Sequence, residues 1–109
     1  MFKRTTLVTK NPWLSRDEFA ALWTGEHLEL ATGLPGLREY VIDFVIDPRT
    51  GDPDGVATVR FDTRAACDAA FATPGLGADL LRTRDAFASQ ARVLHVEEHI
   101  VALPGDGGR

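Results

Sequence analysis

Phe, Leu, Val and Thr predominate among the apolar and polar positions from residue 2 to residue 10, and this pattern predicts a strand that ends at Asn11-Pro12. Ser15-Arg16-Asp17-Glu18 follows with the spacing of a capping box, in which the side chains of Ser15 and Glu18 bind each other's backbone N–H groups. After this cap, apolar residues and one histidine recur at helical spacing: Phe19, Leu22, Trp23, His27, Leu30, Ala31 and Leu34. The helix is predicted to stop near Gly33, because Pro35-Gly36 cannot continue it.

The rest of the chain predicts two further strands, a second helical region and a last strand. Strands at 37–46 and 56–62 flank a turn-rich segment and form a hairpin with a long loop. Thr63 is a suitable N-cap for the next helix, and its inner face is formed by Ala66, Cys67, Ala70 and Phe71. A short helix at 76–87 and a strand at 92–103 complete the pattern.

This order of elements is that of an α+β protein of ferredoxin-like βαββαβ topology. Such a fold has a four-stranded antiparallel sheet with its helices on one face. We expect one domain over residues 1–103 and a flexible C-terminal tail at 104–109.

Helices on one face leave the other face of the sheet uncovered. In the hairpin we expect Ala57, Val59 and Phe61 to face the helices, with Val56, Thr58 and Arg60 opposite. We place on that same uncovered side the last strand's Val93, His95, Glu97, His99 and Val101. Valines mixed with polar residues are typical of a half-wet cavity wall, and they predict that a second copy covers this face. A monomer with a water-facing sheet would carry more Lys and Glu.

Composition narrows the classes of function. The 109 residues carry 12 Lys and Arg against 16 Asp and Glu, and the cations are scattered, which disfavours nucleic acid or an anionic membrane as a partner. The apolar runs are too short to span a bilayer, and the N-terminus does not resemble a signal peptide. A single cysteine, Cys67, makes no internal disulfide, so we expect a cytoplasmic protein.

Three histidines and the cysteine are the first candidates for chemistry. His27 lies on an apolar helical stripe, where burial would keep it neutral as a general base requires; the alternative is a core histidine with one satisfied hydrogen bond. His95 and His99 would lie roughly 13 Å apart on a strand, too far to share one ion, so we expect no metal site. Cys67 is predicted to be buried and inert. Phosphate-binding glycine loops, paired carboxylates and nucleophile elbows do not occur.

Several segments together resemble the EthD family of dimeric α/β-barrel proteins. They are Pro12 to Phe19 with Trp23 and His27, the turn and strand Leu34-Pro35-Gly36-Leu37-Arg38-Glu39-Tyr40, the strand start Asp54-Gly55-Val56-Ala57 with Phe61, and the ending Val96-Glu97-Glu98-His99. The resemblance implies a homodimer with a cavity between sheet and helices in each subunit, and no cofactor. Relatives include lactone isomerases, polyketide cyclases and quinone-forming monooxygenases. Lactone-isomerising members carry an acidic residue and a cysteine where this chain has Thr58 and Val59, which argues against that reaction.

The leading hypothesis is a cofactor-independent enzyme that acts on a small aromatic, polyketide-like or lactone compound. His27 is the expected general base or acid, and Tyr40 and His99 are expected to hold the resulting oxyanion. Expected substrate-binding residues are Trp23, Phe19, Thr58 and Arg60. The two aromatics also suit packing, and Arg60 equally suits an ion pair at the rim with Glu97 or Asp62. The alternatives are a non-catalytic homodimer that binds small molecules in the same cavity, and a purely structural interaction module.

Overall fold

The structure is a computed structural model that describes residues 1–102, and it confirms the α+β, ferredoxin-like class. The strands are β1 (Phe2–Lys10), β2 (Glu39–Phe44), β3 (Gly55–Phe61) and β4 (Ala88–Glu97), and the helices are α1 (Arg16–Leu22), α2 (Leu28–Ala31), α3 (Arg64–Phe71) and α4 (Leu76–Asp85). The tail predicted at 104–109 lies outside the described residues.

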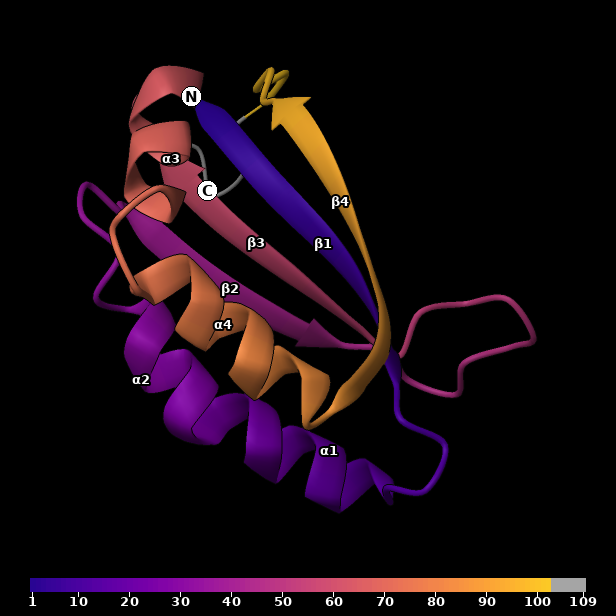
Figure 1. The fold of residues 1–109 in the computed structure, drawn as a ribbon. Helices are drawn as coiled ribbons and strands as arrows, with labels where there is room; N and C mark the ends of the chain where they lie inside the picture. Colours follow the sequence, from indigo (N-terminus) through magenta and orange to yellow (C-terminus); the bar gives the residue numbers. More distant parts are fainter. Residues whose placement is uncertain (103–109) are drawn as a thin grey trace.

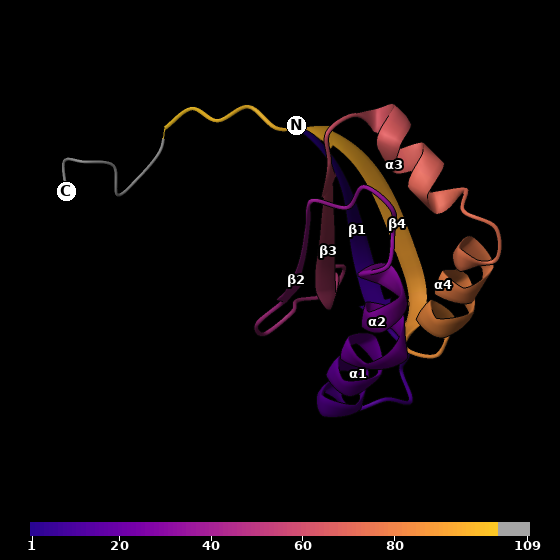
Figure 2. The same ribbon diagram turned by 90° about the vertical axis from the view of Figure 1, so that its left-hand side faces the viewer.

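All four strands form one antiparallel sheet in the order β2-β3-β1-β4. Figure 1 shows the helices lying across the sheet, and the turned view in Figure 2 shows that they occupy one side of it. We call that side the helix face and the other the open face. The register places on the open face Lys3, Thr5, Leu7, Thr9, Glu39, Val41, Asp43, Val56, Thr58, Arg60, Gln90, Arg92, Leu94 and Val96.

Local signals in the sequence set the starts of two helices. The Ser15 hydroxyl accepts from the Glu18 N–H at 3.1 Å, and the Glu18 carboxylate accepts from the Ser15 N–H at 2.8 Å, so the predicted capping box is present. These bonds lower the pKa of Glu18, because they stabilise its charged form. Thr63 caps α3 through the N–H of Ala66 at 3.1 Å.

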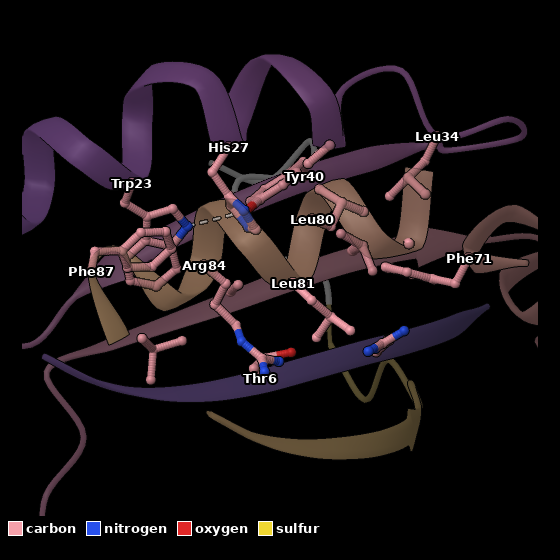
Figure 3. A pocket seen from close by; sticks show the side chains of 16 residues that line it. Thr6, Trp23, His27, Leu34, Tyr40, Phe71, Leu80, Leu81, Arg84 and Phe87 are labelled. Atoms are coloured by element: carbon pink, nitrogen blue, oxygen red, sulfur yellow. Dashed lines mark hydrogen bonds between the residues drawn. The ribbon is translucent and has the colours of Figure 1, made fainter. Parts of the chain in front are cut away.

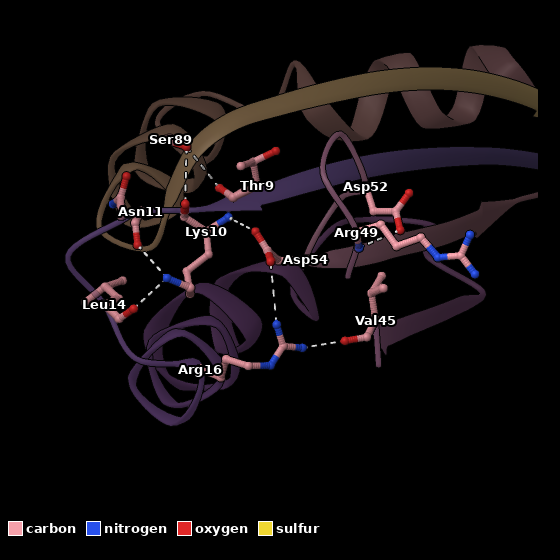
Figure 4. Close-up of polar contacts among 10 residues, drawn as sticks. All are labelled: Thr9, Lys10, Asn11, Leu14, Arg16, Val45, Arg49, Asp52, Asp54 and Ser89. Carbon is pink, nitrogen blue, oxygen red and sulfur yellow. Dashed lines mark hydrogen bonds and ion pairs between the residues drawn. The ribbon is translucent and has the colours of Figure 1, made fainter. Parts of the chain in front are cut away.

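A polar network fixes the end of β1 against its neighbours (Figure 4). The Asp54 carboxylate accepts from the Lys10 N–H at 2.7 Å and pairs with the Arg16 guanidinium at 3.5 Å. Arg16 also donates to the Val45 carbonyl, and the Lys10 ammonium donates to the Leu14 carbonyl at 2.6 Å. The start of α1 is therefore tied to both central strands, which fixes the direction in which the helix leaves the sheet.

The first helical region is interrupted, whereas the sequence predicted one helix from Ser15 to Gly33. A π-helical turn at Trp23–His27 separates α1 from α2, and Gly25 within it has non-helical dihedral angles (φ −87°, ψ −123°). Side-chain periodicity could not show this break, because one extra residue in a turn leaves the apolar stripe nearly continuous. The turn carries two residues of the predicted site, Trp23 and His27.

The last strand differs from prediction in its bounds and in its faces. It spans Ala88–Glu97 instead of 92–103. The strand ends at Glu97 because its one neighbour is β1, whose first residue, Phe2, pairs with Glu97. His95 lies opposite Arg4 on the helix face, and its ring centroid is 5.6 Å from that of Phe2. Val93 and Glu97 share that face, so their predicted place on the open face was wrong; Leu94 and Val96 occupy it instead. The alternation alone could not assign the faces, since both sets contain valines and charges.

The core between sheet and helices consists of two clusters. At the α1 end, Trp23, Phe19 and Phe87 pack with Val8 and Ala88, and the Trp23 and Phe87 rings stack with centroids 5.2 Å apart. The second cluster lies under α3 and the first part of α4, and its buried members are Ala31, Leu34, Val59, Phe61, Cys67, Ala70 and Leu80. Cys67 is buried as predicted, and burial raises the pKa of its thiol.

Candidate functional site

A cavity of about 270 Å³ lies between the helix face of the sheet and the helices. Its walls come from both core clusters, and Figure 3 shows the sixteen side chains that line it. Most are apolar, with Val8, Val59, Leu80 and Phe87 among them. An apolar cavity of roughly 150 Å³ already holds a benzene molecule, so this space suits a ligand somewhat larger than one aromatic ring. Concave, mainly apolar sites with few polar groups are typical of small-molecule binding.

His27 lines this cavity from the π-helical turn, as the sequence predicted. Its Nδ1 lies 2.8 Å from the Thr83 hydroxyl oxygen on α4, and its ring meets the Phe87 ring edge-on at 5.2 Å between centroids. Burial lowers the pKa of His27 to about 4, and the nearby positive charge of Arg84 acts in the same direction. The imidazole is therefore neutral at physiological pH.

Tyr40 lines the cavity from β2, and its hydroxyl is joined to Trp23. The Trp23 indole N–H donates to the Tyr40 oxygen at 3.2 Å (Figure 3). This leaves the phenolic proton of Tyr40, which has no acceptor within residues 1–102, able to donate to a bound molecule. Burial raises the pKa of Tyr40, so the phenol stays protonated.

The cavity also contains polar residues that the sequence did not single out. Arg4 and Thr6 reach it from β1, and Arg84 from α4. Thr83 touches His27 but was missed because its hydroxyl lies on a stripe with Leu80 and Phe87. The available signal was the spacing of Leu80, Thr83 and Phe87, which puts a polar side chain between two apolar ones on the same side of the helical region. A polar residue at a buried position calls for a hydrogen-bond partner, which here is His27. Arg4 could be found only with the strand register known.

Four of the predicted site residues lie outside the cavity of this protomer. Phe19 is buried behind Trp23, with ring centroids 5.4 Å apart, so it acts in packing. Thr58 and Arg60 are on the open face, opposite to the cavity. His99 is exposed beyond the end of β4. The structure thus brings together His27, Tyr40 and Trp23 and separates them from the other four.

Arg60 belongs to a charged cluster at one end of the open face. Its guanidinium makes two parallel hydrogen bonds of 2.6 Å to the Glu98 carboxylate and pairs with Glu39 at 2.7 Å. Lys3 pairs with the same Glu98 carboxylate at 2.9 Å, and these bonds lower the pKa of Glu98. Arg60 therefore has its charge satisfied within the protomer by an ion pair, although its partners are Glu98 and Glu39 and not the predicted Glu97 or Asp62.

Residues 1–102 contain no group of three or more His, Cys, Asp or Glu side chains placed to hold a metal ion. Within the same range, no helix has the length and apolar character needed to cross a bilayer.

The fold and the cavity define a small ferredoxin-like protein with a ligand-sized site between its sheet and its helices. The chain belongs to the EthD family, since the family model of the EthD domain matches residues 11–91. No curated protein matches the chain.

Solved structures of similar fold cover nearly the whole chain. An ethyl tert-butyl ether D (EthD) family protein from Bacillus halodurans is 18% identical with a TM-score of 0.73, covering 91% of this chain and 100% of its own. The cofactor-independent oxygenase SnoaB from Streptomyces nogalater is 16% identical with a TM-score of 0.69, covering 94% and 96%. A dimeric ferredoxin-like protein of unknown function from Thermobifida fusca is 16% identical with a TM-score of 0.68, covering 87% and 88%. These likenesses show the shared fold.

Proposed function

We propose that the protein is a cofactor-independent enzyme that acts on a small aromatic, polyketide-like or lactone compound by proton transfer at His27. The observation that carries the proposal is a neutral imidazole in the wall of an apolar cavity, held through one ring nitrogen. SnoaB, named as a cofactor-independent oxygenase, supports this kind of chemistry on the fold. Removal of a proton next to a carbonyl, or from a phenol, is a first step common to cyclisation, isomerisation, dehydration and oxygenation of such compounds.

The contact with Thr83 selects the tautomer of His27. The Thr83 hydroxyl lies 2.9 Å from the Asp79 carbonyl and 3.2 Å from the Leu80 carbonyl, and it gives its single proton to them. Toward His27 the same oxygen can only accept, so Nδ1 of His27 carries the proton and donates it. The lone pair then belongs to Nε2, which makes that nitrogen the base.

Tyr40 is the group best placed to stabilise the anion that proton removal creates. Its hydroxyl proton is free to donate, and its oxygen is held by the Trp23 indole. A donor positioned before the reaction stabilises a developing oxyanion strongly in a cavity of low polarity. In this mechanism the proton passes from the substrate to Nε2 of His27, and the electron pair left behind is spread onto an oxygen that Tyr40 binds.

We infer as well that the working unit is a homodimer joined through the open face, and that it acts in the cytoplasm. The open face carries Leu7, Val56 and Val96 together with exposed Val41 and Leu94, which are 37% and 36% accessible. A similar protein from Thermobifida fusca is described as dimeric. A second copy would bury these side chains and leave the cavity, on the helix face, open to ligands.

Hydrogen exchange at carbon tests the catalytic proposal without a known substrate. The full-length protein is incubated in D₂O with 2-tetralone, a bicyclic ketone, or with α-angelica lactone, and deuterium uptake next to the carbonyl is followed by NMR. We expect acceleration over buffer for at least one probe, and a loss of about a hundredfold or more in His27→Gln, since general-base catalysis typically contributes that much. Thr83→Val should lower the rate and Thr83→Ser should restore it, because serine keeps the hydroxyl.

His95→Gln is the matched control, because this histidine lies outside the cavity and should leave the rate unchanged. Equal exchange by the wild type and by a folded His27→Gln variant would contradict the proposal. Binding of a probe at the cavity without exchange or product would instead favour the non-catalytic binding protein.

A further inference from the structure

We propose that the natural ligand of the cavity carries a carboxylate, which the guanidinium groups of Arg4 and Arg84 bind, at the end of an apolar body that reaches toward Tyr40. This inference rests on the proposed function, because it concerns the same cavity, and it adds the class of substrate.

The charge of the cavity is opposite to that of the chain. Its sixteen lining residues include two arginines and no aspartate or glutamate, whereas the whole sequence has four more acidic than basic residues. An apolar cavity that gathers positive charge in an acidic protein is complementary to a negatively charged ligand.

Both arginines lack the close carboxylate partner that three other arginines of the chain have. Arg38, Arg60 and Arg82 each have a carboxylate oxygen within 3.1 Å. Arg4 forms no ion pair within residues 1–102, and its guanidinium lies over the Phe71 ring, 3.8 Å from the centroid. Arg84 is 3.9 Å from the carboxylate of Asp85, a residue that points to solvent with 73% of its side chain accessible.

Two such charges in the wall of one cavity raise the free energy of the empty site. Burial lowers the pKa of Arg4, and the charge of Arg84 contributes to this shift, as it does for His27. A planar carboxylate would remove the repulsion and accept paired hydrogen bonds from a guanidinium, which is the geometry that arginine favours. Binding of the carboxylate would then offset the free energy that the two unpaired cations cost in the empty site.

The register of the sheet puts Arg4 and Tyr40, which would bind the two ends of the ligand, on strands at opposite sides of β3. Val59 of β3 pairs with Tyr40 of β2 on one side and with Arg4 of β1 on the other, so the three residues form one row across the helix face. Two strand spacings put the backbones of Tyr40 and Arg4 roughly 10 Å apart. Figure 3 shows Arg84 reaching from α4 toward Thr6 of β1, on the side of the cavity away from Tyr40. The carboxylate therefore lies away from the oxyanion that Tyr40 would hold.

A pair of probes of equal shape tests the inference by binding alone. 2-Naphthoate and 2-naphthamide share one ring system and differ in charge. Their affinities for the full-length protein are measured by calorimetry, and the indole N–H signal of Trp23 in NMR reports occupancy of the cavity. Trp13, which is 73% accessible and outside the cavity, provides the internal reference signal. We expect naphthoate to bind at least tenfold more tightly, which is about 1.4 kcal/mol.

Arg4→Gln and Arg84→Gln should each reduce this preference, and the double variant should bring the two affinities within about twofold, or about 0.4 kcal/mol. Arg82→Gln is the matched control, because Arg82 is on the same helix but pairs with Glu26 outside the cavity. Equal affinities in the wild type, a preference that survives in the double variant, or an equal loss in Arg82→Gln would each overturn the inference, as would failure of naphthoate to bind.

The anion site and the proposed function can fail separately. Naphthamide binding without charge preference would leave the proposed function standing. A charge preference together with full activity of His27→Gln would remove the catalytic role and keep the anion site.

Discussion

At the scale of single residues, the fold changes the ionisation of His27 and thereby links stability to pH. Its pKa falls from 6.5 to about 4 through burial, so between these values the unfolded chain binds a proton that the folded protein does not. The free energy of unfolding that this group contributes is complete above pH 6.5 and decreases as the pH falls toward 4. Hydrogen bonds lower the pKa of Glu18 and Glu98, and these carboxylates act at lower pH than His27 because their ordinary pKa is 4.5.

Urea denaturation at several pH values checks this prediction. Between pH 6.5 and 4.5 the wild type should lose up to about 2 kcal/mol more than His27→Gln, at about 1.4 kcal/mol per pH unit. The His27 ring signals should also keep their neutral chemical shifts down to about pH 5 in an NMR titration. Parallel stability curves for the two proteins would show that the imidazole is not buried as described.

The sequence predicted those residues of the candidate site that have a local signal, and it missed those whose place depends on distant contacts. His27 and Tyr40 were found because a histidine on an apolar stripe and a tyrosine after Leu-Pro-Gly-Leu are local features, strengthened by the family resemblance. Arg4 and Arg84 were not found, because their meaning depends on contacts between β1 and α4, which are far apart in sequence. Arg60 was expected on the face away from the helices, and the register confirms that place, so the ligand role considered for it does not fit a cavity on the helix face.

At the scale of elements, the contact between Gly55 and Trp23 fixes the first helical region over the start of β3. A Cβ atom added at Gly55 would overlap the Trp23 ring, so only glycine lets the ring lie on the strand. We predict that Gly55→Ala lowers the free energy of unfolding by about 1–3 kcal/mol, as overpacking of a core commonly does. It should also displace the indole from Tyr40 and weaken binding in the cavity.

A double-mutant cycle separates this clash from a general effect of the substitution. In a Trp23→Phe background the ring is smaller, and Gly55→Ala should cost clearly less than in the wild type when both are measured by urea denaturation. An equal cost in both backgrounds would mean that the two residues do not meet.

Element boundaries followed from the sequence wherever a local signal set them. Ser15 and Thr63 cap their helices with their own side chains, and both positions were predicted. The end of β4 at Glu97 depends instead on where β1 begins, and the π-helical turn after Leu22 is joined to α4 by the contact of His27 with Thr83. Contacts of that kind leave no periodic trace in the chain, so prediction failed at these two places.

At the scale of the whole molecule, the sheet has two faces with different tasks. The helix face holds the cavity and both core clusters, whereas the open face combines a band of Leu and Val with the Arg60, Glu98 and Lys3 cluster at one end. A band of this kind is costly to leave in water, and the charges beside it limit how a second copy can be placed. The two faces are back to back, so a second copy bound to the open face would not compete with a ligand in the cavity.

Charged substitutions on the open face give the last prediction. A two-fold dimer buries the same patch of both copies, so Val41→Glu with Leu94→Glu would bury two unpaired carboxylates from each chain and should convert the protein into a monomer. Light scattering after size exclusion should give a mass near twice the 11.9 kDa of the chain for the wild type at about 10 µM, a concentration at which an interface of ordinary affinity stays closed. It should give the mass of one chain for the variant.

Leu22→Glu is the matched control, since Leu22 is 41% accessible but lies on α1, away from the open face. A wild type of single mass, or dissociation by Leu22→Glu as well, would show that the open face is not where two copies meet.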